Sequence, residues 1–188
     1  MRPVILLDVD GVLADFVGHY IDTLEWCGKV QVCREDIVNE DIPGCLQLTT
    51  HQRQTAEMLI ASAGAAERIR ALEGAATAVA TLRGMGRVVF VTTPWPGAAT
   101  WVHDRLQWLG VRFGCRPEDY FPVADKSLVD GAVMIDDSLR NVAMWHRPGR
   151  LTLLWDTPHN RSTEPPAGIT RVTSWDAVFE AVRFHLGQ

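Results

Sequence analysis

Two aspartates separated by a single residue, Asp8 and Asp10, are the first residues of this chain that could do chemistry. They follow the apolar run 4–7, whose composition is that of a buried parallel strand. The spacing alone is weak evidence, but the end of a buried strand is where open α/β sheets place their ligand sites. Gly11 follows, so the chain can turn sharply and present a backbone N–H to an anion. We therefore expect an anion-binding site at this strand end.

Two further apolar runs end in polar residues in the same way. The run 88–91 continues into Thr92 and Thr93, and the run 132–135 continues into Asp136 and Asp137. The carboxyl ends of parallel strands meet at one edge of a sheet, so hydroxyls and four carboxylates are expected to converge there. Four carboxylates at one point repel each other unless a hard cation neutralises them. Oxygen ligands beside an anionic substrate favour Mg²⁺ as the cofactor.

A lysine is expected to complete this group. Lys126 lies ten residues before Asp136, on the segment that leads into the third run. Its ammonium could reach the same edge, hold a phosphate and soften the repulsion between Asp8 and an incoming anion. The residues predicted to bind phosphate are Gly11, Thr92, Thr93 and Lys126.

The chain around these residues alternates between strand and helix. Strands are expected at 4–7, 88–91, 132–135 and 151–154, and helical periodicity covers 75–85, 98–109 and 139–145. This alternation predicts an α/β fold, a Rossmann-like parallel sheet with helices on both faces. Residues 15–73 break the pattern, because they hold several helical pieces and no convincing strand. They are predicted to form a small helical cap, inserted after the first strand of a core made of residues 1–14 and 74–188.

The composition excludes several classes of protein. The chain has 188 residues and a formal net charge of −5 without a run of like charge, which argues against binding a nucleic acid polymer. No apolar stretch is long enough to span a membrane, and the run 4–7 is too short for a signal peptide, so a cytoplasmic location is expected. The four cysteines form no metal-binding pattern and are expected to be free thiols.

Taken in order, these motifs resemble the haloacid dehalogenase superfamily of aspartate-nucleophile phosphatases. Its four motifs correspond to Asp8-Val9-Asp10-Gly11-Val12, Thr92, Lys126 and Asp136-Asp137. A closer resemblance is to the 5′(3′)-deoxyribonucleotidase family. Similar segments are Leu7 to Phe16, Thr92-Thr93-Pro94, Asp125-Lys126, Ile135-Asp136-Asp137 and Ser174-Trp175. The resemblance implies a Mg²⁺-dependent phosphatase with a (deoxy)nucleoside monophosphate as its small phosphorylated substrate.

The resemblance also implies a role for each motif. Asp8 would attack the phosphorus and form an aspartyl-phosphate. Asp10 would protonate the leaving alcohol and then take a proton from the hydrolytic water. Thr92 and Lys126 would complete the catalytic set by binding phosphoryl oxygens in the transition state. The metal ligands would be Asp8, Asp10 through its backbone carbonyl, and Asp136. Asp137 would hold a metal-bound water or orient the lysine.

Substrate specificity is expected to come from the cap. Phe16 would stack on a substrate ring and Trp95 would line the pocket mouth, although packing roles suit both residues as well. The nucleotidase family carries an arginine two residues before the motif lysine, where this chain has Ala124. This departure leaves open a phosphatase of a sugar phosphate or another small biosynthetic ester, and a phosphomutase.

A binding module on the same fold is a more remote alternative. Such a protein would be expected to lack Asp8, Asp10 or Lys126, and all three are present. The oligomeric state is not defined by the sequence, and a homodimer stays open.

Overall fold

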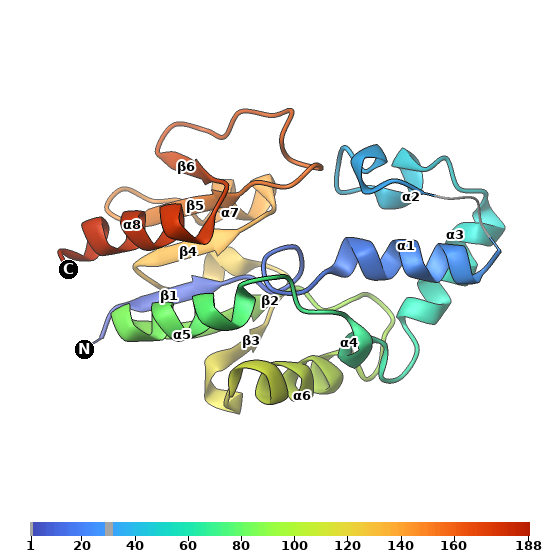
Figure 1. Ribbon diagram of the computed structural model, residues 1–188, viewed down its shortest axis with the longest axis horizontal. Coiled ribbons are helices and arrows are strands. Elements are labelled where there is room, and N and C mark those ends of the chain that lie inside the picture. The colour runs from blue at the N-terminus through green and yellow to red at the C-terminus, as the bar shows by residue number, and fades with distance from the viewer. Residues whose placement is uncertain (1, 29–31) are drawn as a thin grey trace.

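The centre of the molecule is a six-stranded sheet in which every pair of neighbouring strands is parallel (Figure 1). The computed structural model describes residues 2–28 and 32–188. The strands are β1 (Val4–Leu7), β2 (Arg87–Thr92), β3 (Tyr120–Pro122), β4 (Val133–Asp136), β5 (Leu151–Trp155) and β6 (Ile169–Val172). Their order across the sheet is β3-β2-β1-β4-β5-β6. The prediction of a Rossmann-like parallel sheet is confirmed.

Helices cover both faces of this sheet, which is why its strands are apolar on both sides. The helices outside the insertion are α5 (Ala75–Met85), α6 (Trp101–Phe113), α7 (Leu139–Trp145) and α8 (Trp175–Leu186), with short 3₁₀ turns η2 (Pro117–Asp119) and η3 (Lys126–Leu128). Ile5 and Leu7 belong to the large apolar cluster that includes residues of α5, α6 and α8, whereas Leu6 joins a second cluster with Trp145 of α7. Successive residues of β1 therefore anchor opposite layers.

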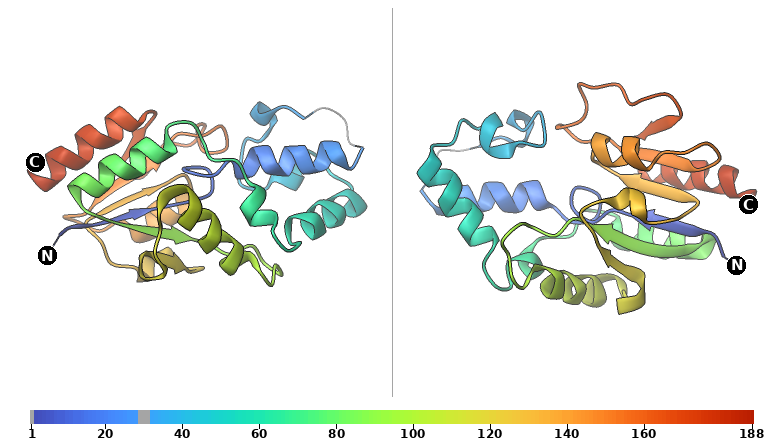
Figure 2. Two further views of the ribbon diagram at one scale, coloured as in Figure 1. Left: turned by 60° about the horizontal axis from the view of Figure 1, so that its bottom comes forward. Right: turned by 180° about the vertical axis from the view of Figure 1, so that it is seen from behind.

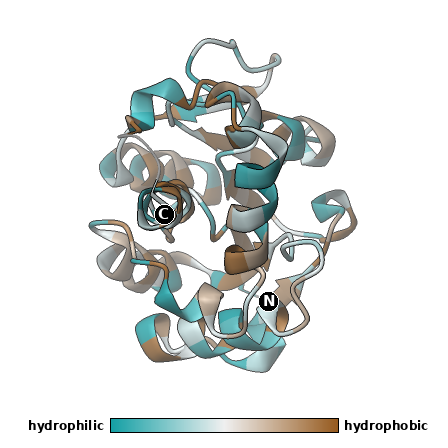
Figure 3. Ribbon diagram, turned by 90° about the vertical axis from the view of Figure 1, so that its right-hand side faces the viewer, coloured by the Kyte–Doolittle hydropathy of each residue, from teal (hydrophilic) through white to brown (hydrophobic). Residues whose placement is uncertain are grey.

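The segment predicted to be a cap is helical and lies beyond one end of the sheet in every view (Figures 1 and 2). Its described elements are α1 (Phe16–Trp26), η1 (Arg34–Asp36), α2 (Ile42–Cys45), α3 (Thr50–Ile60) and α4 (Ala65–Arg68). The helices of this segment carry both hydrophobic and hydrophilic residues, as expected of helices with one buried side (Figure 3). We propose that this segment is a cap domain on a core formed by the rest of the chain.

Two backbone hydrogen bonds join the chain segments that enter and leave this cap. The Asp15 N–H donates to the Arg70 carbonyl and the Leu72 N–H donates to the Leu13 carbonyl, both at 2.8 Å. Asp15 also accepts a hydrogen bond from the Gly18 N–H and so begins α1. The two connections are therefore fixed next to the end of β1.

Two strands and one helix boundary differ from the prediction. β3 and β6 were not predicted: β3 has three residues, and β6 is an edge strand in which only Ile169 and Val172 are buried. Neither offers the continuous apolar run that marks a central strand. The helix expected at 98–109 begins instead at Trp101, because Pro96 and Gly97 form a turn ahead of it.

The cysteines are free thiols, as predicted. Cys115 is buried, and this burial raises the pKa of its thiol to about 11. Among the described residues, no helix has both the length and the apolar character needed to cross a membrane.

Candidate active site

A buried lysine joins two carboxylates at the carboxyl edge of the sheet. Lys126 Nζ lies 2.6 Å from Asp8 Oδ1 and 2.7 Å from Asp136 Oδ2. All three side chains are almost completely buried. Asp8 follows β1, Asp136 ends β4, and Lys126 opens η3, so adjacent strands bring these residues together as the sequence predicts.

The charges in this group are not balanced. Asp8, Asp136 and Asp137 each place a carboxylate oxygen within 4.8 Å of the other two. Burial, and then repulsion from Asp136, raise the pKa of Asp8 to about 8, against the opposing effect of Lys126. Burial lowers the pKa of Lys126, but the two carboxylates outweigh it and keep this pKa above its usual value. Burial and the charge of Asp8 also raise the pKa of Asp137 well above its usual value. This donor set suits a hard divalent cation.

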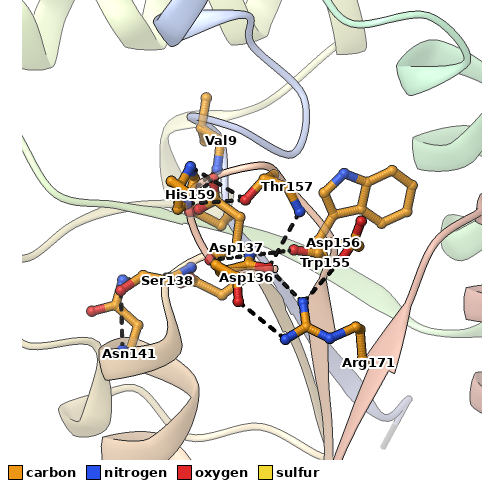
Figure 4. A network of polar contacts seen from close by, with 12 residues as sticks. Val9, Asp136, Asp137, Ser138, Asn141, Trp155, Asp156, Thr157, His159 and Arg171 are labelled. Carbon is orange, nitrogen blue, oxygen red and sulfur yellow. Dashed lines mark hydrogen bonds and ion pairs between the residues drawn. The ribbon is translucent and has the colours of Figure 1, made fainter. Parts of the chain in front are cut away.

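Asp136, the last residue of β4, and Asp137, which follows the strand, have very different surroundings (Figure 4). Asp136 accepts hydrogen bonds from Lys126, from the Ser138 N–H at 2.8 Å and from Asn141 Nδ2 at 3.2 Å. The Asp137 carboxylate contacts His159 Nε2 at 3.4 Å, and burial lowers the pKa of that histidine. Asp136 is thus saturated by donors within the protein, whereas Asp137 has oxygens available for a ligand.

Gly11 allows the first loop to approach Asp137 closely. Its φ is +82°, and a Cβ at this position would lie 1.7 Å from Asp137 Oδ2. The position therefore requires glycine on both conformational and steric grounds. The Gly11 N–H donates to the Ala14 carbonyl at 2.9 Å. This differs from the prediction that the N–H is free to bind phosphate, because the turn itself uses it.

The Asp10 carboxylate is held by residues of β2 and α6. The hydroxyl of Thr92, at the end of β2, donates to Asp10 Oδ2 at 3.4 Å. Arg105 Nη2, from α6, donates to Asp10 Oδ1 at 2.7 Å. Asp10 keeps a quarter of its side chain exposed. Thr93, also predicted to bind phosphate, is exposed, and its hydroxyl donates to the Val123 carbonyl.

A cavity of about 190 Å³ opens over these groups. Its floor includes Asp8, Asp10, Gly11, Thr92, Thr93, Lys126 and Asp137. Its other walls come largely from the helical segment and include Phe16, Val17, Ile37, Asn39, Glu40 and Ile42. Phe16, which was predicted to stack on a substrate ring, lies in this wall. Trp95 packs behind it with ring centroids 5.2 Å apart and is not among the described residues that line the cavity.

Among the residues at this site that were not predicted, Asn141, Arg105, His159 and Asn160 contact its charged residues or fix the loop beside them. Asn141 and Arg105 lie on helices, and their spacing alone resembles that of ordinary amphipathic surfaces. His159 and Asn160 lie in the segment 156–168, which reads from sequence as a surface loop. Asn160 Nδ2 instead donates to the backbone carbonyls of Asp137 and Trp155 at 2.8 Å and fixes the loop against the site.

The fold is that of the haloacid dehalogenase-like hydrolases, as solved structures show. A family hydrolase from Deinococcus radiodurans R1, solved with bound phosphate and sodium, has a TM-score of 0.58 at 17% identity, covering 98% of this chain and 96% of its own. A hydrolase from Bacillus subtilis bound to magnesium also has a TM-score of 0.58, at 14% identity, with 96% and 98% covered. Both likenesses concern the fold.

Sequence comparison identifies the family within this fold. The model of the family described as 5′ nucleotidase, deoxy (pyrimidine), cytosolic type C protein matches residues 2–185. The chain therefore belongs to this family, and it is an enzyme of the phosphatase class. It is also similar to a 5′(3′)-deoxyribonucleotidase of Bacillus subtilis (strain 168), at 22% identity over 179 residues, which are 95% of this chain and 97% of that protein. The resemblance inferred from the motifs is confirmed.

Proposed function

We propose that this enzyme is a Mg²⁺-dependent phosphomonoester hydrolase that works through an aspartyl-phosphate and acts on (deoxy)nucleoside monophosphates. The observation that carries the proposal is the Asp8–Lys126–Asp136 group at the floor of a cavity. Together with Asp137, this group combines a buried carboxylate, a cation that can bind phosphate and a further acidic pair in one place. The cytosolic type named in the family description supports the cytoplasmic location that the sequence predicts.

The contacts of the acidic pair favour a revised assignment of the metal ligands. Asp8, Asp137 and the backbone carbonyl of Asp10 would hold Mg²⁺, while Asp136 would fix Lys126. The prediction assigned direct binding to Asp136, but its oxygens are already occupied by protein donors. When bound, the ion would neutralise the excess buried charge and polarise the phosphoryl group.

In the proposed reaction, Asp8 forms a bond to phosphorus while the bond from phosphorus to the leaving oxygen breaks. Asp8 Oδ1 accepts from Lys126 and from the Val9 N–H, so the carboxylate is fixed before substrate arrives. Asp10, in its acid form, gives its proton to the leaving oxygen. Asp10 then takes a proton from the water that attacks the phosphoenzyme, and the Asp8 carboxylate is restored as phosphate leaves. Lys126 and Thr92 support the charge on the phosphoryl oxygens.

Substitution of Asp136 and of Asp137, at the end of β4, tests the metal assignment without relying on turnover. Asp137→Asn removes one of three mutually repelling carboxylates, so its unfolding free energy without metal should be unchanged or higher. The apparent Kd of this variant for Mg²⁺, obtained from the stabilisation that Mg²⁺ gives, should rise more than about tenfold. Asp136→Asn should instead destabilise the protein by about 1.5–3 kcal/mol, because Lys126 loses a charged partner. Denaturant unfolding with Mg²⁺ or EDTA measures both. The opposite pattern would return the ligand role to Asp136.

The composition of the cavity walls favours a substrate that carries a flat, largely apolar group. Phe16, Val17, Ile37 and Ile42 provide apolar surface above the predicted phosphate site. A nucleobase fits this description better than a polyhydroxylated sugar, which needs many polar partners. The name of the similar Bacillus protein points to the same substrate class. Ala124 is exposed and cannot replace the family arginine, so a phosphatase of another small ester is the second candidate.

A substrate panel tests the proposal directly. The protein is incubated with ribo- and deoxyribonucleoside monophosphates and with several sugar phosphates, in Mg²⁺ or EDTA, and released phosphate is measured. Mg²⁺-dependent release chiefly from nucleotides is the expected result. Release from sugar phosphates alone would keep the chemistry and reject the nucleotide, and an isomerised sugar phosphate without free phosphate would indicate a phosphomutase.

A further inference from the structure

Arg105 is a completely buried cation outside the group of residues that the motifs identify. It lies on α6 between Trp101 and Trp108, at a spacing that places all three side chains on one face of the helix. That face packs against the core, and the arginine has no exposed surface. An arginine at such a position costs a great deal of solvation free energy unless the protein supplies partners.

The partners of Arg105 are two indole rings and one carboxylate. Its Cζ lies 5.0 Å from the ring centroid of Trp101 and 5.3 Å from that of Trp108. These contacts stabilise a buried guanidinium without directing it. Nη2 donates to Asp10 Oδ1 at 2.7 Å, while Nε and Nη1 have no hydrogen-bond partner in the described part of the chain. Within residues 2–28 and 32–188, the one hydrogen bond that Arg105 donates from its side chain is thus to Asp10.

This contact distinguishes the two oxygens of the Asp10 carboxylate. Oδ1 is occupied by Arg105, whereas Oδ2 has only the longer contact with the Thr92 hydroxyl, at 3.4 Å. Both oxygens thus have a partner, but only the contact of Oδ1 with Arg105 is short. Oδ2 is therefore the oxygen available to exchange a proton with substrate or water. A general acid must meet the leaving oxygen at hydrogen-bond distance, so its rotation matters for the rate.

We propose that Arg105 is a positioning residue that orients the Asp10 carboxylate for proton transfer to the leaving group. The inference rests on the proposed function, because it takes Asp10 as the general acid and base. The ion pair of Arg87 and Asp119 offers a comparison at the opposite edge of the sheet. Arg87 is half exposed, and its Nε donates to Asp119 Oδ1 at 2.8 Å, remote from the cavity.

The test compares two leaving groups. An alkoxide from a deoxynucleoside 5′-monophosphate needs a proton as it departs, whereas p-nitrophenolate does not. Arg105→Met keeps an apolar side chain of similar length between the two indoles and removes the charge. We expect kcat on the nucleotide to fall about 10²-fold with little change in KM, because general acid catalysis is worth 10²–10⁴-fold. The pre-steady-state burst of p-nitrophenolate from p-nitrophenyl phosphate should keep its rate constant within about threefold, since that step needs no acid.

Two further variants separate positioning from stability. Arg105→Lys keeps the charge, so its turnover of the nucleotide should lie between those of the wild type and Arg105→Met. Arg87→Met breaks an ion pair without touching Asp10, so the ratio of the two activities should stay at the wild-type value. Equal losses on both substrates for Arg105→Met, or a change confined to KM, would overturn the inference.

A variant that fails to fold does not remove the test. If Arg105→Met does not fold, Arg105→Lys is measured instead, both alone and in the Asp10→Asn background. Arg105→Lys should lower kcat in the wild-type background and have no further effect once Asp10 is gone. Additive losses would reject the positioning role. A wild-type enzyme without Mg²⁺-dependent turnover of either substrate would instead reject the proposed function, and the inference with it.

Discussion

Asp8→Asn is expected to abolish turnover, with kcat lower by a factor on the order of 10⁴ or more, because the amide cannot act as the attacking oxygen. The fold should survive the change. Lys126 keeps Asp136 as a partner at 2.7 Å, and the new side-chain oxygen can still accept from the Val9 N–H. Phosphate release from the best substrate of the panel, with circular dichroism to verify folding, gives the measurement.

The control for this loss is Asp130→Asn. Asp130 is an exposed aspartate whose partner is Arg150, remote from the cavity, so its substitution should leave kcat unchanged. Asp8→Ala is measured as well, because it cannot revert to aspartate by deamidation. A folded Asp8→Ala enzyme that kept a substantial fraction of wild-type turnover would show that Asp8 is not the nucleophile.

Lys126→Met has the largest expected effect on stability. It leaves Asp8, Asp136 and Asp137 buried together without the cation that lies between two of them. Removing one partner of a buried ion pair costs about 3–5 kcal/mol, so the unfolding free energy in EDTA should fall by that amount. Mg²⁺ should restore part of the loss, because a cation that binds the native state stabilises it by mass action. Chemical denaturation with and without Mg²⁺ is the appropriate measurement.

The loss of unfolding free energy caused by Lys126→Met should also depend on pH. The pKa values of Asp8 and Asp137 are raised in the folded protein, so the native state holds their protons more tightly than the unfolded chain does. Stability from this source is present at low pH and is lost as the pH rises toward about 8, the pKa of Asp8. The variant should therefore lose more stability at pH 8 than at pH 5. Arg53→Met, which breaks an exposed pair with Glu57, should cost less than about 1 kcal/mol at either pH. An equally small cost for Lys126→Met in EDTA would contradict the electrostatic account.

The local pattern of the chain was sufficient to predict the four strands β1, β2, β4 and β5 of the sheet and the position of the candidate site. Apolar runs that end in Asp8, Thr92 and Asp136 are short-range features, and the geometry of parallel strands brings their carboxyl ends together whatever the rest of the chain does. The helical insertion was visible for the same reason, since it interrupts a regular alternation. Hydrophobic periodicity thus determined the architecture and the identity of the central carboxylates.

Tertiary packing alone decided how these groups are paired. Sequence cannot show which of Asp136 and Asp137 receives the lysine, because both stand at the end of one strand and the choice depends on side chains from η3 and α7. Nor can it show that Arg105 is buried, since the carboxylate that accepts its hydrogen bond belongs to Asp10, 95 residues away along the chain. A charged residue on an amphipathic helix is normally exposed to solvent. Arg105 is buried because α6 packs against the loop that follows β1 and carries Asp10. The sequence by itself therefore determined where the candidate site lies, and long-range contacts determined how each charge is held there.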